Sequence, residues 1–339
     1  MLKFYTDIHE ITSENRSRVF PMLFDWFYLE HPSVKDYFEL VTTIEAADVC
    51  ILALDLGFYL SQNKKHEVDA FIVAAQHHTK KVWIYSGGDF GTTLAADVIL
   101  FRLGGFHSQM NLNTFVLPSF INDPYTTVLS KKWKPLSKGE KPTIGFVGNA
   151  DGSLFKWTKE ALIYGKQTLN RFLKNDFTDT QSFFPSSSIR FKFLEQLRLS
   201  KHIQTDFIYR NKYRAGATTA VEKAKTTLEF YENMERNLYT FCLRGSGNFS
   251  VRFYETLMMG RIPVLIDTDV RLPFHQTLAW KTHCVFATPE NFIAQLIAFH
   301  EQHSNEDLLE LQHQNRALAL GQLNRQAYFI SISKLANVI

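Results

Sequence analysis

A glycine-rich turn followed by charged residues at helical spacing gives the strongest chemical signal in this sequence. Gly245 and Gly247 allow the backbone to approach a ligand closely, because glycine has no Cβ atom. Ser250 is a suitable N-cap for the helix expected after them, and the N–H groups of a first helical turn attract an anion such as a pyrophosphate. Arg252 and Glu255 share a face of that helix, where an arginine can grip phosphate oxygens and a carboxylate can accept ribose hydroxyls. The spacing alone fits a phosphate-binding turn and a surface ion pair between Arg252 and Glu255 about equally well.

The elements around this turn are typical of α/β units. Short β-rich runs alternate with longer helical patterns along the chain, which predicts parallel sheets. Strands are expected at 3–6, 47–54, 81–86, 98–102, 114–117, 143–147, 206–209, 238–243 and 262–266. Helices are expected at 21–28, 67–77, 157–175, 190–199, 218–234, 250–259, 291–300, 308–321 and 325–339.

A change of composition divides these elements into two groups. Residues 130–142 hold five lysines, two prolines and a glycine with little apolar content, which is typical of a linker. Two α/β domains joined in this way form a cleft, and ligands of open α/β sheets bind at the carboxyl ends of the strands. Residues 86–91, 148–152 and 244–250 are therefore expected at the cleft.

Several short motifs follow one another between residues 239 and 334. They are Phe-Cys-Leu at 241–243, the glycine turn, Ser-x-Arg-x-x-Glu at 250–255, Gly-x-Ile-Pro-Val at 260–264, Leu-Pro-Phe at 272–274 with Trp280 downstream, and a tail at 327–334. Their order resembles the signature of the exostosin-type glycosyltransferases, in a bacterial, GT-B-like form. Where that family often has a proline before the turn's glycine, this chain has Arg244, which we interpret as an additional phosphate ligand.

The resemblance implies a GT-B-type fold of two Rossmann-like domains that face a cleft. Residues 1–135 would bind the acceptor, residues 136–322 would bind the nucleotide sugar, and a closing helix at 323–339 would cross back to the first domain. Arg252 would contact phosphate and Glu255 would contact ribose. Asn248 and Arg210 are further donor-binding candidates, although the basic residues from Arg210 onward also fit a solvated loop.

The reaction that the resemblance implies is transfer of a sugar from a nucleotide-sugar donor, UDP-linked by family analogy, with inversion and without an essential metal or other cofactor. The expected acceptor is an oligosaccharide or glycolipid in surface polysaccharide or lipopolysaccharide synthesis. A non-catalytic nucleotide- or sugar-binding module of the same fold is the main alternative. An epimerase or phosphorylase of related fold is the other, and it would need no separate acceptor.

Direct displacement needs a general base from the N-terminal domain, across the cleft. Asp89 is the first choice because glycines on both sides expose it at a strand end, and its alternative role is a helix N-cap. His107, after two glycines, and His9, after the first strand, are further candidates. Asp267 and Asp269 match an Asp-x-Asp metal pattern, but a loop of solvated acids is the favoured interpretation, so no metal site is expected.

Charge and composition limit the class of protein. The net charge of +3 comes from 37 basic and 34 acidic residues, which does not indicate a nucleic-acid partner. Cys50, Cys242 and Cys284 sit in apolar runs and are expected to be buried in a reducing compartment, without a disulfide or zinc site. No apolar run reaches about 18 residues, and the N-terminus lacks the pattern of a signal peptide. A cytoplasmic protein with peripheral membrane contact is expected.

Overall fold

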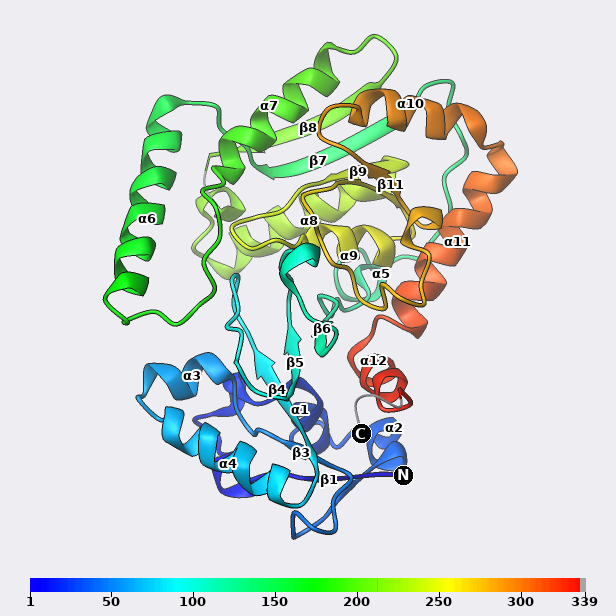
Figure 1. The fold of residues 1–339 in the computed structure, drawn as a ribbon. Helices are drawn as coiled ribbons and strands as arrows, with labels where there is room; N and C mark the ends of the chain where they lie inside the picture. The colour runs from blue at the N-terminus through cyan, green and yellow to red at the C-terminus, as the bar shows by residue number, and fades with distance from the viewer. Residues whose placement is uncertain (212, 336–339) are drawn as a thin grey trace.

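Two parallel β-sheets, each flanked by helices, form the frame of the molecule (Figure 1). The computed structural model describes residues 1–211 and 213–335. The first sheet has the order β2-β1-β3-β4-β5-β6 and consists of β1 (Leu2–Tyr5), β2 (Phe38–Leu40), β3 (Val49–Ile51), β4 (Lys81–Ser86), β5 (Ile99–Arg102) and β6 (Thr114–Val116). The second has the order β11-β10-β9-β7-β8 and consists of β7 (Thr143–Asn149), β8 (Gln204–Arg210), β9 (Tyr239–Cys242), β10 (Ile262–Ile266) and β11 (Val285–Ala287). The expected α/β fold with two Rossmann-like sheets is confirmed.

The helices of the first half are α1 (Pro21–Phe27), α2 (Pro32–Tyr37), α3 (Leu56–Ser61), α4 (Lys65–His77) and α5 (Pro124–Thr127). Those that follow are α6 (Leu154–Phe172), α7 (Ser186–Leu199), α8 (Ala220–Arg236), α9 (Val251–Met258), α10 (Phe292–Gln302), α11 (Asn305–Gly321) and α12 (Arg325–Ile332). The sequence did not predict α2, α3, α5, β2 or β11, because elements of three to six residues are too short to show a period. The last helix ends at Ile332 rather than 339, and residues 336–339 lie outside the described part of the chain.

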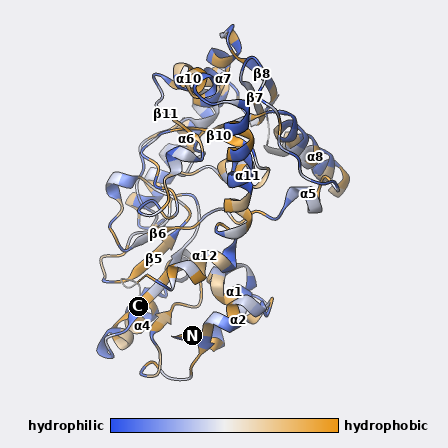
Figure 2. Cartoon of the chain, turned by 90° about the vertical axis from the view of Figure 1, so that its right-hand side faces the viewer, coloured by the Kyte–Doolittle hydropathy of each residue, from blue (hydrophilic) through white to orange (hydrophobic). Residues whose placement is uncertain are grey.

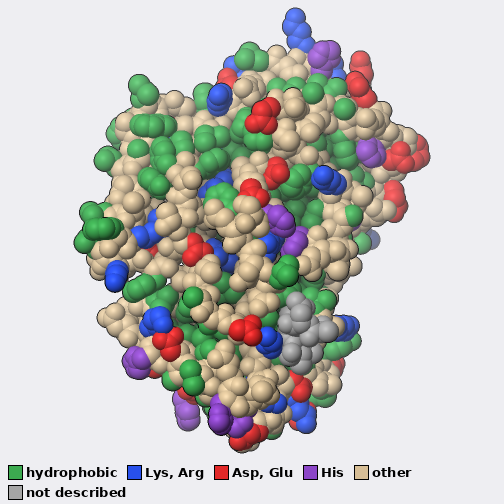
Figure 3. All heavy atoms as spheres, viewed as in Figure 1, with side chains coloured by type: hydrophobic (Ala, Val, Ile, Leu, Met, Phe, Trp, Pro, Cys, Tyr) green, Lys and Arg blue, Asp and Glu red, His purple; other side chains and the backbone are tan. Residues whose placement is uncertain are grey.

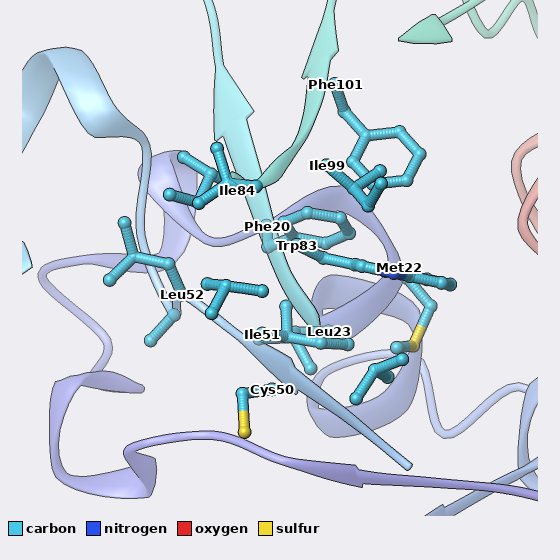
Figure 4. Close-up of a cluster of buried hydrophobic side chains, with 14 of the residues drawn as sticks. Phe20, Met22, Leu23, Cys50, Ile51, Leu52, Trp83, Ile84, Ile99 and Phe101 are labelled. Carbon is cyan, nitrogen blue, oxygen red and sulfur yellow. The ribbon is translucent and has the colours of Figure 1, made fainter. Parts of the chain in front are cut away.

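Aromatic side chains fill the core of the first sheet (Figure 4). Phe20 meets Phe101 edge to face at 5.4 Å between ring centroids, and Trp83 lies 5.2 Å from Phe101. All three side chains are fully buried, so the high phenylalanine content is used here for core packing. The cysteines follow the same pattern, because all three are buried and free as expected.

Helix α12 lies against the first sheet's half of the molecule, although α11 before it packs on the second (Figures 1 and 2). Phe329 enters the first core, 5.4 Å from Phe20. The Tyr328 hydroxyl donates to the carbonyl of Val116 at 2.9 Å. An ion pair between Arg325 and the buried Asp25 of α1 fastens the beginning of the helix.

The connection between the sheets is extended but firmly attached. The Trp133 indole N–H donates to the Met259 carbonyl at 2.9 Å, and the Leu136 N–H donates to Gln312 Oε1 of α11 at 2.8 Å. Segment 130–142 therefore connects the two sheets as expected, but its polar composition does not leave it loose. Several of its backbone groups, including the N–H groups of Leu136 and Lys138, hydrogen-bond to side chains of the second half.

Candidate functional site

A cavity of about 550 Å³ opens where the two halves face each other. Its walls come from the ends of β7 and β9, the glycine turn, the start of α9 and the inner face of α8, and the first half contributes the loop after β4. This is the carboxyl edge of the second sheet, the place where open α/β sheets bind ligands. The sequence-predicted residues that line it are Asp89, Arg210, Gly245, Gly247, Ser250, Arg252 and Glu255.

Arg252 lies deep in this cavity rather than on an open helix surface. Its Nη2 donates to the Val147 carbonyl at 2.7 Å, and its guanidinium lies 4.2 Å from the centroid of the Phe146 ring. Burial lowers the pKa of Arg252, which means that the site disfavours its positive charge as long as no anion is bound. These contacts fix the guanidinium in place before a ligand arrives.

Two further arginines reach the same cavity from other elements. Arg190 of α7 donates from Nη1 to the Asn149 carbonyl at 2.6 Å, and Arg210 at the end of β8 donates from Nη2 to the Thr226 carbonyl at 2.9 Å. Burial, followed by the charge of Arg252, lowers the pKa of Arg190 to about 9. Among the described residues, the Nε atoms of all three arginines are buried without a hydrogen-bond partner. Within the described residues, Arg210 is the only one of the three that forms an ion pair with a carboxylate, that of Glu229. Arg190 and Arg252 therefore bring to the cavity positive charge that no ion pair in the described part of the chain neutralises, and a bound anion would neutralise it.

The turn before α9 brings its backbone to the cavity wall. Ser250 is the N-cap of α9, but the prediction that its side chain caps the helix is wrong. The bond to the first turn comes instead from the backbone, because the Ser250 carbonyl accepts from the Phe253 N–H at 3.2 Å. The Ser250 side chain lines the cavity and is not committed to the helix.

Asp89 faces the arginine-lined wall from the loop after β4. No helix follows it between residues 87 and 106, so the alternative N-cap role is wrong. Its side chain keeps contact with solvent, yet the surrounding protein is dense enough that burial raises its pKa above the ordinary value of 3.8. The loop is held by Asp55, whose Oδ1 accepts the Gly87 N–H at 2.6 Å. The turn before α9 approaches this loop so closely that position 247 requires a glycine. A Cβ atom there would lie 2.0 Å from the Asp89 carbonyl oxygen.

The two histidine candidates lie outside the cavity lining. His9 is exposed in the turn after β1. His107 stands in a short turn after β5, where its Nδ1 accepts from Arg271 Nε at 3.2 Å and its ring packs edge to face on His275. The structure thus brings only Asp89, of the three proposed bases, to the arginine wall.

Arg244 and Asn248 are also absent from the cavity lining, and both are buried beside it. Arg244 donates from Nη2 to Gln181 Oε1 at 2.6 Å, and its guanidinium lies 4.6 Å from the Phe184 ring centroid. Burial lowers its pKa to about 10. Asn248 donates to the Gly105 carbonyl at 3.2 Å, which ties the turn to the first half. These residues hold the walls together, and their direct contact with a ligand stays a prediction.

Arg190 is the main cavity residue that the sequence did not single out. The sequence predicts that this helix begins at Arg190, but α7 begins at Ser186, so Arg190 lies in the second turn and a cation at a helix start is no signal for it. The apolar part of the lining, Phe230 of α8, also had no signal in the sequence.

The two acids of the Asp-x-Asp pattern are used to hold the loop after β10. Asp267 Oδ1 accepts from the Asp269 N–H at 2.8 Å, and Asp269 Oδ2 accepts from the Ser108 hydroxyl at 2.5 Å across to the first half. The interpretation as merely solvated acids is therefore incomplete. Among the described residues, no group of three or more His, Cys, Asp or Glu side chains is placed to hold a metal ion.

Comparison with known proteins adds a family. The model of the exostosin GT47 domain matches residues 53–302, which include the cavity, the whole second sheet and strands β4, β5 and β6 of the first. A probable glucuronosyltransferase of Oryza sativa subsp. japonica is 36% identical over 62 residues, which are 18% of this chain and 15% of that protein. The probable β-1,4-xylosyltransferase IRX10 of Arabidopsis thaliana is 34% identical over 62 residues, with the same shares. The match thus spans about a seventh of the length of these plant relatives.

Solved structures show distant likeness. The TarM structure has a TM-score of 0.36 and 10% identity, covering 84% of this chain and 54% of that one. AviGT4, a glycosyltransferase involved in avilamycin A biosynthesis, has a TM-score of 0.29 and 8% identity, covering 98% of both chains. The fold description above therefore depends on the strand order observed in this chain.

Proposed function

This chain belongs to the exostosin GT47 family of glycosyltransferases, and we propose that it transfers a sugar from a UDP-linked donor to a carbohydrate acceptor with inversion. The observation that carries the proposal is the cavity lined by Arg190, Arg210 and Arg252, with Asp89 on the opposite wall. Such a cavity suits a ligand with a diphosphate at one end and a reacting carbon between the two walls.

The donor's diphosphate is proposed to lie against the three arginines. Their paired N–H groups match phosphate oxygens, and a dianion offsets the burial and the repulsion by Arg252 that lower the pKa of Arg190. Glu255, on the same helix as Arg252 and at the cavity wall, is proposed to accept the ribose hydroxyls. The arginines stabilise the leaving diphosphate, so we propose a reaction without an essential metal ion.

Asp89 is proposed as the general base. It takes the proton of an acceptor hydroxyl while that oxygen forms a bond to the anomeric carbon, and the bond from this carbon to the diphosphate oxygen breaks on the opposite side. The direction of attack inverts the anomeric centre. A raised pKa suits this role, because a base is most effective when its pKa approaches the working pH.

The acceptor is proposed to be a growing surface polysaccharide or a glycolipid such as lipopolysaccharide, reached from the cytoplasm. The plant relatives carry names of transferases that act with glucuronic acid or xylose, which supports a saccharide acceptor and leaves the sugar to be found by screening.

The test is thermal unfolding of the wild type, Arg252→Ala and Arg316→Ala with a panel of nucleotide sugars. Arg316 is a matched control, because it also stacks on an aromatic ring and pairs with Asp123, but it lies outside the cavity. A donor at 100 times its Kd stabilises the wild type by about 2.7 kcal/mol. Loss of a charged hydrogen bond in Arg252→Ala should weaken binding about 10- to 100-fold.

Arg316→Ala should lower stability but leave the shift caused by the donor unchanged. The donor that gives a shift is then incubated with saccharide acceptors, and NMR of the product reports the anomeric configuration. Binding without any transfer or donor hydrolysis would favour the non-catalytic module. No shift with any nucleotide sugar would contradict the proposal.

A further inference from the structure

Helix α6 stands at the edge of the second half (Figure 1), and hydrophobic side chains lie on the molecular surface in this region (Figure 3). Leu154, Phe155, Leu162 and Phe172 are 82, 79, 76 and 82% exposed, and Leu169 is 55% exposed. At 100° per residue these positions fall on one side of the helix, together with Leu173 just beyond it. This apolar stripe is a group of exposed large apolar side chains on one helix face, which is typical of an interaction site.

The opposite side of α6 attaches the helix to the protein. Trp157 and Tyr164 pack on Phe183 with ring centroids 5.7 and 5.3 Å apart. The Arg171 guanidinium lies 4.9 Å from the ring centroid of Phe90, in the loop that carries Asp89. The helix therefore has a defined inner face, and the apolar stripe is its outer face.

The charges of α6 are distributed unequally between these two faces. Lys159 and Lys166 are exposed and border the apolar stripe, and Lys174 is exposed directly after the helix. The one acid of the helix, Glu160, is turned inward, where Lys156 lies 3.9 Å from it. The outer face is thus apolar in the middle and positive at its border.

We infer that α6 docks the protein on the surface of an anionic lipid bilayer. An apolar stripe bordered by lysines inserts its side chains below the headgroups, while the ammonium groups meet the lipid phosphates. Within the described residues no helix is long and apolar enough to cross a bilayer, so the contact is with one leaflet. The exposed lysines beside the stripe match the negative charge of an anionic lipid surface, and a second copy of the chain is an outcome that the test below distinguishes.

The position of α6 links this surface to the larger cavity. Its inner face forms one wall of a second cavity of about 180 Å³, to which Ser186 and Ser246 also contribute. The same two serines line the 550 Å³ cavity. A bilayer on the outer face of α6 would therefore lie within a helix diameter of the cavity system. The inference does not depend on the proposed reaction, because lipid binding is measured without substrate.

The test is co-sedimentation with two kinds of vesicle, phosphatidylcholine alone and phosphatidylcholine mixed with phosphatidylglycerol. The wild type should bind the mixed vesicles. Phe155→Ser/Leu162→Ser/Phe172→Ser should lower the partition about 100-fold. Lys159→Gln/Lys166→Gln should lower it about 25-fold on the mixed vesicles, at about fivefold per lysine, and leave it unchanged on phosphatidylcholine.

The matched control is Val73→Ser/Leu112→Ser/Leu199→Ser, which removes equally exposed side chains from other elements and should bind like the wild type. Circular dichroism confirms that each variant is folded. Absence of wild-type binding to the mixed vesicles would overturn the inference. Equal losses of vesicle binding in the control variant and in the triple serine variant of α6 would also overturn it. The same holds if the wild type forms a dimer that does not bind vesicles and that only the triple serine variant of α6 dissociates.

Discussion

Substitution of Gly247 by alanine should separate the two walls of the cavity. A Cβ atom at this position would lie 2.0 Å from the carbonyl oxygen and 2.8 Å from the carbonyl carbon of Asp89. Ordinary contact begins at 3.4 Å, so the loop after β4 and the turn must move apart by about 1.4 Å. Both partners are backbone, which means that no side-chain rotation relieves the clash.

The expected cost appears in two measurements. Overpacking of this kind lowers the free energy of unfolding by about 1–3 kcal/mol, which urea denaturation detects. Asp89 would also be displaced by more than 1 Å from its place in the cavity lining, and such a displacement of the proposed base costs about 100-fold in rate. Initial rates of sugar transfer, measured by product formation at saturating donor, report this second effect.

Gly245→Ala is the matched control, because it makes the same chemical change in the same turn. A Cβ at position 245 would meet no atom within 4 Å. This variant should therefore keep wild-type stability to within about 0.5 kcal/mol and should lose little activity. Equal losses in Gly245→Ala and Gly247→Ala would show that the reasoning from close approach is incorrect.

Two other changes test separate contacts. Asp89→Asn should lower kcat about 10²- to 10⁴-fold with donor affinity unchanged. Because only the ionised carboxylate accepts a proton, the kcat/KM of the wild type should rise with pH through a midpoint above 3.8. If the same rise persists in Asp89→Asn, Asp89 is not the base. Asp179→Ala should lower the free energy of unfolding by about 2 kcal/mol, because Arg102 is 4% exposed and would lose the carboxylate with which it pairs. Asp69→Ala, which removes a surface ion pair with Lys65, should lower it by less than about 0.5 kcal/mol. Chemical denaturation measures both, and similar losses would mean that burial of Arg102 is energetically unimportant.

The sequence predicted the site residues that are close together in the chain, but it did not predict which distant elements meet them in the fold. Gly247, Ser250 and Arg252 were predicted at the cavity because a strand, a turn and a helix follow one another over a short stretch of chain. Their neighbours Arg190 and Phe230 come from helices far away in sequence. They meet Arg252 because β7 lies between β8 and β9 in the second sheet, and no local periodicity reveals that strand order.

Helix α6 shows the same limit in another form. The sequence predicts a helix at 157–175, and its apolar residues would suit a core as well as a surface. The structure shows that Trp157 and Tyr164 face Phe183, which leaves the side with Leu162 and Phe172 uncovered. Similarly, Arg244 and Arg252 lie near one turn, and only their surroundings in the structure distinguish the buried Arg244, which holds the walls together, from Arg252, which lines the cavity.

The return of α12 to the first sheet also determines the order in which the chain can complete its folding. Phe329 and Tyr328 fill space beside Phe20 and Val116, so that core stays open until α12 has been synthesised. At about 5–20 residues per second, β6 would wait roughly 10 to 40 s for its last partner on the ribosome. During this interval the first half must expose aromatic surface. The core residues of the second sheet lie between Ile144 and Leu311, so all of them are synthesised before α12.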